Sequence, residues 1–214
     1  MTRSTRNLAV LAAVILAGCG GTAPPPVVSG GPAAPSPVVL GAPDTAGATL
    51  GSPNALYTYR FKMSEPGSSS FNYRDRDLTF YFRPTATALY FKVENLQGRP
   101  VWINWDQSAF QDAHGRIGKV AHSTTRWRDR FATTAQTQVP PQQQISEYVF
   151  SMDDLLDAGA GVNDDNQPHR PILPEDQSAP SFTGRTFGVD LQMLIDDKPR
   201  MYTFRFQVAS VIPR

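Results

Sequence analysis

The sequence is poor in the residues that most often build catalytic sites and covalent cross-links. It has one cysteine and three histidines in 214 residues. A single cysteine excludes an internal disulfide, so ordinary packing must hold the fold together. The histidines, His114, His122 and His169, are scattered and do not have the spacing that places two metal ligands on one face. We therefore expect no resident metal, no cofactor and no enzymatic activity.

An excess of charge of one sign is also absent, as is one common catalytic motif. The chain has 20 Lys and Arg against 19 Asp and Glu, which gives no electrostatic reason to expect a nucleic-acid partner. The serine-hydrolase motif Gly-x-Ser-x-Gly is missing, and the nearest run, Gly67 to Ser70, lacks its second glycine. An enzyme would have to assemble its site from residues far apart in the chain.

Aromatic residues are missing from the first quarter of the chain, which instead has the layout of an export signal. Arg3 and Arg6 precede the apolar run Leu8 to Leu16, which has signal-peptide length. The run ends in Leu-Ala-Gly-Cys at Cys19, which resembles the lipobox of bacterial lipoproteins. The resemblance implies cleavage of residues 1–18, lipidation of Cys19 with acyl groups such as palmitate, and attachment to a membrane of the cell envelope. Gly20, where an Asp would retain the protein at the inner membrane, implies the outer membrane in a Gram-negative host.

After the cysteine, the chain lacks the residues that build a core. Residues 19–54 are rich in Pro, Ala, Gly, Ser and Val and include neither an aromatic side chain nor Lys, Arg or Glu. Such a composition cannot bury enough apolar surface to offset the entropy of ordering. We expect a disordered tether at residues 19–54 and one folded domain at residues 55–214.

Apolar residues alternate with polar ones through the folded part. Leu78, Phe80 and Phe82 share one face of a strand, and the same period of two recurs several times, with turn signals between the runs. No long stretch has helical periodicity, although Ser151 could cap one short turn. The pattern predicts an all-β fold, an immunoglobulin-like antiparallel sandwich. Further strands are expected through Ile117 and Val120 and, after the turn at Val139, at Ile145 to Phe150. The other alternating sets are Leu89, Phe91 and Val93; Val101, Ile103 and Trp105; Phe187 to Ile195; and Tyr202 to Val208.

One central stretch carries a second resemblance. It contains an Asn-bearing turn, the run Trp-Ile-Asn-Trp-Asp-Gln-Ser-Ala-Phe from Trp102, an Asp-x-x-Gly turn at Asp112 and Val-Ala-His ending at His122. With the turn at Val139, it resembles bacterial lipoproteins that have a single β-sandwich domain. The resemblance implies a fold and an envelope location, and it implies no activity.

The most suggestive binding residues are arginines that alternate with aromatic side chains. Arg126, Trp127, Arg128 and Arg130 lie in one short run, where they could stack on rings or pair with carboxylates and phosphates. The alternative is a solvated loop in which Asp129 compensates part of the charge. Two tryptophans add to this group, because a regular strand would place them on opposite faces, one in the core and one able to contact a partner. They are Trp102 and Trp105.

Carboxylates gather in and before a long Pro- and Asn-rich segment at residues 159–181. They are Asp153, Asp154, Asp157, Asp164 and Asp165. Because the Gly and Glu spacing of a calcium loop is absent, the sequence favours a solvated acidic loop over a Ca²⁺ site.

Taken together, these patterns predict a lipid-anchored envelope lipoprotein. Its β-domain would act as a non-enzymatic binding or structural module for an envelope protein, glycan or lipid, through loops such as residues 122–131 and 159–181. The alternative is an envelope hydrolase or metal-dependent enzyme whose site is not visible as a linear motif.

Overall fold

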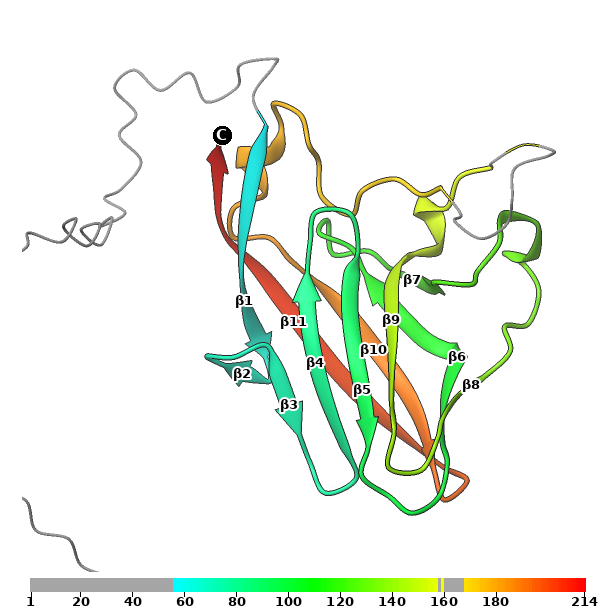
Figure 1. The fold of residues 1–214 in the computed structure, drawn as a ribbon. Helices are drawn as coiled ribbons and strands as arrows, with labels where there is room; N and C mark the ends of the chain where they lie inside the picture. The colour runs from blue at the N-terminus through cyan, green and yellow to red at the C-terminus, as the bar shows by residue number, and fades with distance from the viewer. Residues whose placement is uncertain (1–55, 158, 160–167) are drawn as a thin grey trace, which may run out of the picture. The chain divides into compact units, whose positions relative to one another are not determined.

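The computed structural model describes residues 56–157, 159 and 168–214, and in that part the chain is built from β-strands (Figure 1). Three short 3-10 helices accompany them: η1 (Trp127–Asp129), η2 (Met152–Asp154) and η3 (Ala179–Phe182). The described part contains no helix long and apolar enough to cross a membrane. The strands are β1 (Tyr57–Glu65), β2 (Gly67–Ser68), β3 (Asn72–Arg74), β4 (Leu78–Pro84), β5 (Leu89–Asn95), β6 (Val101–Gln111), β7 (Ile117–His122), β8 (Thr137–Val139), β9 (Gln144–Ser151), β10 (Thr186–Ile195) and β11 (Lys198–Pro213).

All pairings are antiparallel and join the strands into one eleven-stranded sheet. Its order is β2-β1-β11-β10-β6-β7-β9-β5-β4-β3, with β8 paired to β6 at the side. β7 connects the two halves, because Ile117 to Lys119 pair with β6 and Val120 to His122 pair with β9. The predicted all-β, antiparallel class is confirmed. The immunoglobulin-like sandwich stays a prediction.

Aromatic side chains from the two halves of the sheet meet in the core. The Phe204 ring of β11 lies 4.9 Å from that of Phe80 and 4.5 Å from that of Phe82, both on β4. β4 and β11 are far apart in the strand order, so the sheet folds back on itself to bring these rings together. All three residues are at least nine-tenths buried. Such aromatic contacts add to the free energy gained by burying apolar surface.

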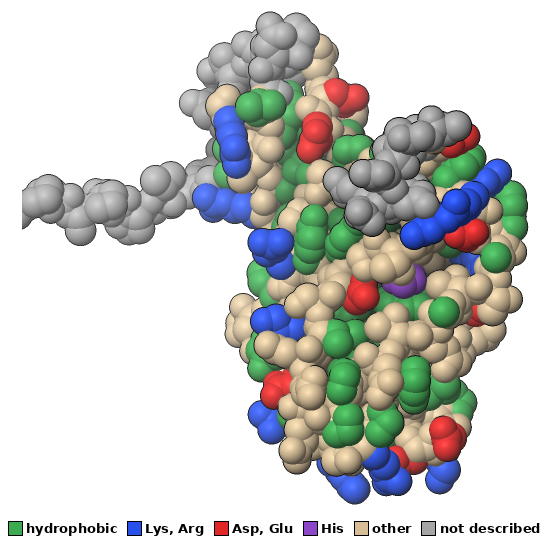
Figure 2. All heavy atoms as spheres, turned by 45° about the vertical axis from the view of Figure 1, so that its right-hand side comes forward, with side chains coloured by type: hydrophobic (Ala, Val, Ile, Leu, Met, Phe, Trp, Pro, Cys, Tyr) green, Lys and Arg blue, Asp and Glu red, His purple; other side chains and the backbone are tan. Residues whose placement is uncertain are grey.

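The turns at one end of the domain place the polar residues discussed below. β10 and β11 are joined by Asp196 and Asp197, both at positive φ, which is the geometry of a two-residue hairpin turn. Lys198 and Pro199 already belong to β11. In Figure 1 this turn lies at the lower end of the domain, and Figure 2 shows Lys and Arg side chains at the same end.

Candidate functional site

The connection between β7 and β8, residues 123–136, lines a cavity. It opens with a tight turn, in which the backbone N–H of Thr125 donates to the carbonyl of His122 (2.9 Å), and continues into η1. The cavity, called the loop pocket below, has a volume of about 380 Å³. Its lining is mostly polar, with hydroxyl groups from five threonines. The lining residues are His122, Thr124, Thr125, Arg126, Asp129, Ala132, Thr133, Thr134, Ala135, Gln136 and Thr137.

Strand residues hold the returning half of this loop in place. The backbone N–H of Thr134 donates to Oδ1 of Asp106 (3.0 Å), and the same oxygen pairs with Nζ of Lys119 at 3.4 Å. Nζ of Lys119 also donates to the carbonyl of Ala132 (3.3 Å). The loop pocket is therefore shaped by fixed contacts to β6 and β7.

A buried histidine lies at the strand side of the loop pocket. The His122 ring stacks on the indole of Trp105, with 4.2 Å between ring centroids and 7° between planes. Nδ1 of His122 is buried and has no hydrogen-bond partner among the described residues. Oε2 of Glu147 is 3.7 Å away, beyond hydrogen-bond distance, and accepts from the hydroxyl of Ser123 (2.5 Å). A buried polar atom without a partner is a place where a bound molecule can add a hydrogen bond.

Ser123, His122 and Glu147 are residue types that also form catalytic triads, but here they are arranged differently. In a triad the imidazole lies between the hydroxyl and the carboxylate and accepts the hydroxyl proton. Ser123 instead donates directly to Glu147, and His122 stacks flat against Trp105. This geometry orients the serine hydroxyl toward an acceptor and does not activate it as a nucleophile.

The predicted arginine-rich run borders the loop pocket. Arg126 and Asp129 contribute to its lining. The Arg130 guanidinium lies over the Trp127 ring at 3.9 Å and over the Phe131 ring at 4.4 Å, and it donates to the carbonyl of Trp127 (2.7 Å). Trp127 also packs against the core. The run is thus a compact stacked unit.

Two members of the run face solvent. Arg128 pairs with Asp129 at 3.7 Å, and both side chains are largely exposed. Asp129 therefore compensates part of the positive charge, as the solvated-loop interpretation proposed. Phe131 is 85 % exposed, the highest value among the large hydrophobic residues of the described part. An exposed aromatic ring next to a polar pocket is a common feature of contact surfaces.

The two tryptophans of β6 lie on opposite faces, as the alternation predicted. Trp105 is fully buried, and its Nε1 donates to Oγ1 of Thr137 (2.8 Å). Trp102 is only partly buried, and it lies opposite Gln138 of β8 and Leu194 of β10 in the sheet register. Trp105 therefore supports the loop pocket from behind, whereas Trp102 does not contribute to its lining.

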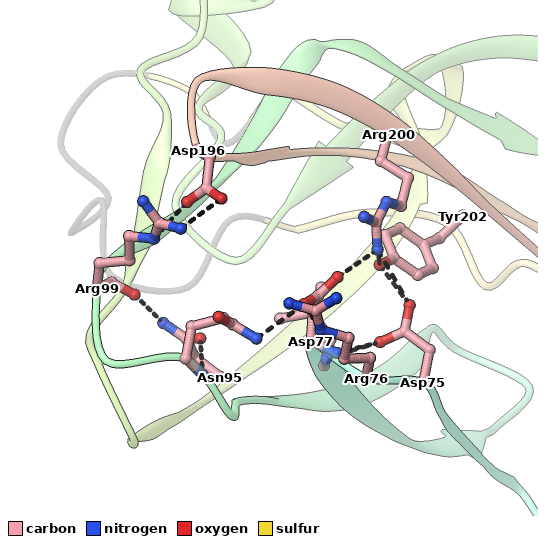
Figure 3. Close-up of polar contacts among 10 residues, drawn as sticks. Asp75, Arg76, Asp77, Asn95, Arg99, Asp196, Arg200 and Tyr202 are labelled. Carbon is pink, nitrogen blue, oxygen red and sulfur yellow. Dashed lines mark hydrogen bonds and ion pairs between the residues drawn. The ribbon is translucent and has the colours of Figure 1, made fainter.

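A second polar group, called the end cluster below, connects the turns at the lower end of the domain (Figure 3). Nη1 of Arg200 contacts Oδ2 of Asp77 at 2.6 Å and Oδ2 of Asp75 at 3.4 Å. The Tyr202 hydroxyl donates to the same oxygen of Asp75 (2.7 Å), and Gln97 donates to Oδ1 of Asp77 (2.7 Å). Residues of β11 are thereby joined to the β3–β4 turn, more than one hundred positions earlier in the chain.

The environment of the end cluster shifts several pKa values. Burial alone would raise the pKa of Asp75, but the backbone N–H of Leu78, the Tyr202 hydroxyl and the N–H of Asp77 donate to it and hold the pKa below its usual value. Burial and the contact with Asp75 raise the pKa of Tyr202. Hydrogen bonds to Tyr202 and Asp77 raise the pKa of Arg200. Asp75 is therefore ionised and Tyr202 is neutral near pH 7.

Sequence analysis gave no prediction for the end cluster, and a local signal for it is hard to find. Asn95, which lies next to the end cluster, is one residue whose role a sequence can suggest. An Asn before a turn often forms hydrogen bonds with nearby backbone groups. Nδ2 of Asn95 donates to the carbonyls of Arg99 (2.8 Å) and Val139 (3.1 Å). The remaining members come from separate turns and meet only in the folded chain.

Two of the acidic residues around η2, Asp154 and Asp157, have individual partners in the described part. Asp154 pairs with Arg170 at 3.3 Å, and Asp157 accepts from the N–H of Gly159 (3.0 Å). The described residues contain no group of three or more His, Cys, Asp or Glu suited to hold a metal ion. Asp164 and Asp165, like Cys19, lie outside the described residues.

Comparisons with known proteins place no further constraint on the site: no family model, no curated protein and no solved structure matches the chain.

Proposed function

We propose that the protein is a lipid-anchored envelope protein whose loop pocket binds a hydroxyl-rich partner, such as an envelope glycan, without a chemical reaction. The observation that carries this proposal is the lining of the loop pocket, in which five threonines and Gln136 surround a cavity of about 380 Å³. Hydroxyl and amide groups can both donate and accept hydrogen bonds, which matches the alternating donors and acceptors of a sugar. Arg126 and Asp129 add charged partners to the same wall.

Binding through the loop pocket also fits the way in which the pocket is built. Its walls are held by Asp106, Lys119 and Trp105, so the loop loses little freedom when a ligand enters. The exposed ring of Phe131 offers an apolar face of the kind on which sugars stack. The expected membrane anchor at Cys19 would keep this site within the cell envelope.

Removal of two pocket hydroxyls tests the binding site. Thr124 and Thr133 line the loop pocket, and their hydroxyls make no hydrogen bond within the described part. The double variant Thr124→Val, Thr133→Val keeps side-chain shape and removes donors that a glycan would use. We expect it to weaken binding about thirtyfold, because each of the two lost hydrogen bonds contributes roughly 1 kcal/mol. Isothermal titration of the full-length protein in detergent with soluble cell-wall glycan fragments measures this.

Thr183→Val is the matched control, because Thr183 is an exposed threonine outside the loop pocket. It should bind like the wild type. The glycan proposal is wrong if wild-type protein binds none of the fragments, or if the control weakens binding as much as the double variant does.

The proposed anchor has its own test. Cells that express the full-length chain are supplied with radiolabelled palmitate and then fractionated. We expect the wild type to carry the label and to sediment with membranes. Cys19→Ser should lose the label and much of the membrane association, because the thiol is the attachment point. A labelled Cys19→Ser protein, or an unlabelled wild type, would contradict lipidation at this residue.

A further inference from the structure

A hollow lined in part by residues of the end cluster gathers positive charge. Its volume is about 260 Å³, and it lies between the β3–β4, β5–β6 and β10–β11 turns. Four cationic and two anionic side chains line it, which leaves a net charge of +2, whereas the whole chain has a net charge of only +1. The charged lining residues are Arg76, Arg99, Lys198, Arg200, Asp77 and Asp196.

The two carboxylates of this hollow are already paired with arginines that line the same hollow. Asp77 accepts from Arg200 (2.6 Å) and Gln97 (2.7 Å), and only 10 % of its side chain is exposed. Asp196 is held by two parallel contacts from Arg99, with 2.5 Å to Nε and 2.6 Å to Nη2. Such bidentate pairing satisfies the carboxylate oxygens. Neither carboxylate has strong unpaired charge left to repel an anion.

The cations, in contrast, retain donors that can face a ligand. Lys198 is exposed and has no ion-pair partner among the described residues, and Arg76, with 92 % of its side chain exposed, reaches Asp77 only at 3.9 Å. Arg200 uses one of its two terminal nitrogens, Nη1, for all its contacts in the end cluster. Figure 3 shows the Arg99–Asp196 pair on one side and the Arg200–Asp77 pair on the other.

The hollow lies at one end of the domain, and residue 57 lies at the other. β11 begins at Lys198 beside the hollow, and its far end pairs with the start of β1, where Pro213 lies opposite Tyr57. Sixteen strand residues span roughly 50 Å at 3.3 Å per residue. Both ends are visible in Figure 1. The charged hollow thus faces away from residue 57.

We propose that this hollow binds a phosphate-type oxyanion. Guanidinium groups match the geometry of phosphate oxygens, and an ammonium group adds a mobile point charge. The two inner ion pairs fix Arg99 and Arg200 in place, so they present their remaining donors with little loss of side-chain entropy. The same chemistry is offered by free phosphate and by the phosphate of a lipid headgroup. The site is separate from the loop pocket and does not depend on the glycan proposal.

The test uses the two cations that are least involved in the fold. Full-length protein in detergent is titrated with inorganic phosphate, at constant ionic strength, and binding is followed by calorimetry. We expect saturable binding by the wild type and about tenfold weaker binding by the double variant Arg76→Gln, Lys198→Gln. Lys62→Gln is the control, because Lys62 is an exposed lysine of β1 outside the hollow. It should leave binding unchanged.

A vesicle experiment distinguishes the two sources of phosphate. Vesicles of phosphatidylcholine alone and vesicles with added phosphatidate are mixed with the full-length Cys19→Ser chain and sedimented. If the protein binds free phosphate and the binding requires Arg76 and Lys198, the result supports a small-anion site. Binding only to phosphatidate vesicles, with the same requirement, supports a headgroup site. The proposal is overturned if neither form of phosphate binds, or if the double variant and Lys62→Gln behave alike.

Discussion

At the scale of single residues, Asp75 makes stability depend on pH. Its pKa is lowered in the folded chain, so folding favours the ionised form. This contribution is fully present above the unfolded pKa of about 3.9 and is lost as the pH falls through the lower, folded value. We expect Asp75→Asn to lower the urea midpoint near neutral pH, and the difference from wild type to shrink below about pH 3. Chemical unfolding at a series of pH values measures this.

Asp197→Asn is the control for Asp75→Asn. Asp197 is an exposed turn carboxylate at positive φ, where Asn is well tolerated, and it has no hydrogen-bond or ion-pair partner among the described residues. Its substitution should leave the pH dependence unchanged. A difference between Asp75→Asn and wild type that stays constant down to the lowest pH would show that the substitution acts by shape and not by charge.

Single residues also show where sequence reasoning stops. The alternation in β6 was enough to predict that one of Trp102 and Trp105 is buried and the other is not. The alternation could not predict that His122 stacks on Trp105. His122 belongs to β7, and the contact depends on the register in which β7 pairs with β6. Glu147 and Asp106 were missed for the same reason. A lone carboxylate in a strand looks like a solvated residue until its partners are known.

At the scale of elements, Gly188 allows β10 and β11 to approach each other. It lies opposite Arg205 in the register, and a Cβ at this position would lie 2.0 Å from the carbonyl oxygen of Phe204. The obstacle is backbone and cannot rotate away. We expect Gly188→Ala to lower the free energy of unfolding by about 1 to 3 kcal/mol, because the strands must separate. Urea unfolding of the full chain measures the loss.

Gly98 provides a matched substitution in the β5–β6 turn. A Cβ at Gly98 would meet no atom within 4 Å, so Gly98→Ala should change stability by no more than about 0.5 kcal/mol. Equal losses of stability from the two substitutions would mean that the close approach to Phe204 does not set the cost of Gly188→Ala.

The strands differ in how well they can be predicted from their sequences. β4, β5, β10 and most of β11 carry the alternating pattern that predicted them, because one side of each is packed in the core. β2, β3 and β8 are only two or three residues long and were not predicted. A strand of that length has no period to detect, and its partner in the sheet determines it. β8 matters most, since Thr137 closes the loop pocket.

At the scale of the whole molecule, the folding of one continuous sheet upon itself predicts a single cooperative unit. Phe204 of β11 contacts Phe80 and Phe82 of β4, which ties together strands near the two ends of the sheet order. We expect the transitions seen by tryptophan fluorescence and by far-ultraviolet circular dichroism to coincide. Phe204→Ala should shift both together and cost about 3 to 5 kcal/mol, since it leaves a cavity where the halves meet.

Met201→Ala tests whether the loss of stability in Phe204→Ala comes from the core contact or from any substitution in β11. Met201 is in the same strand but half exposed, so its loss should cost no more than about 0.5 kcal/mol. If the fluorescence transition, which reports on β6 and the loop pocket through Trp102, Trp105 and Trp127, separated from the circular dichroism transition in Phe204→Ala, the two halves would be independent. The loop pocket could then lose its shape while the end cluster stayed folded, and the two proposed binding sites would have separate stabilities.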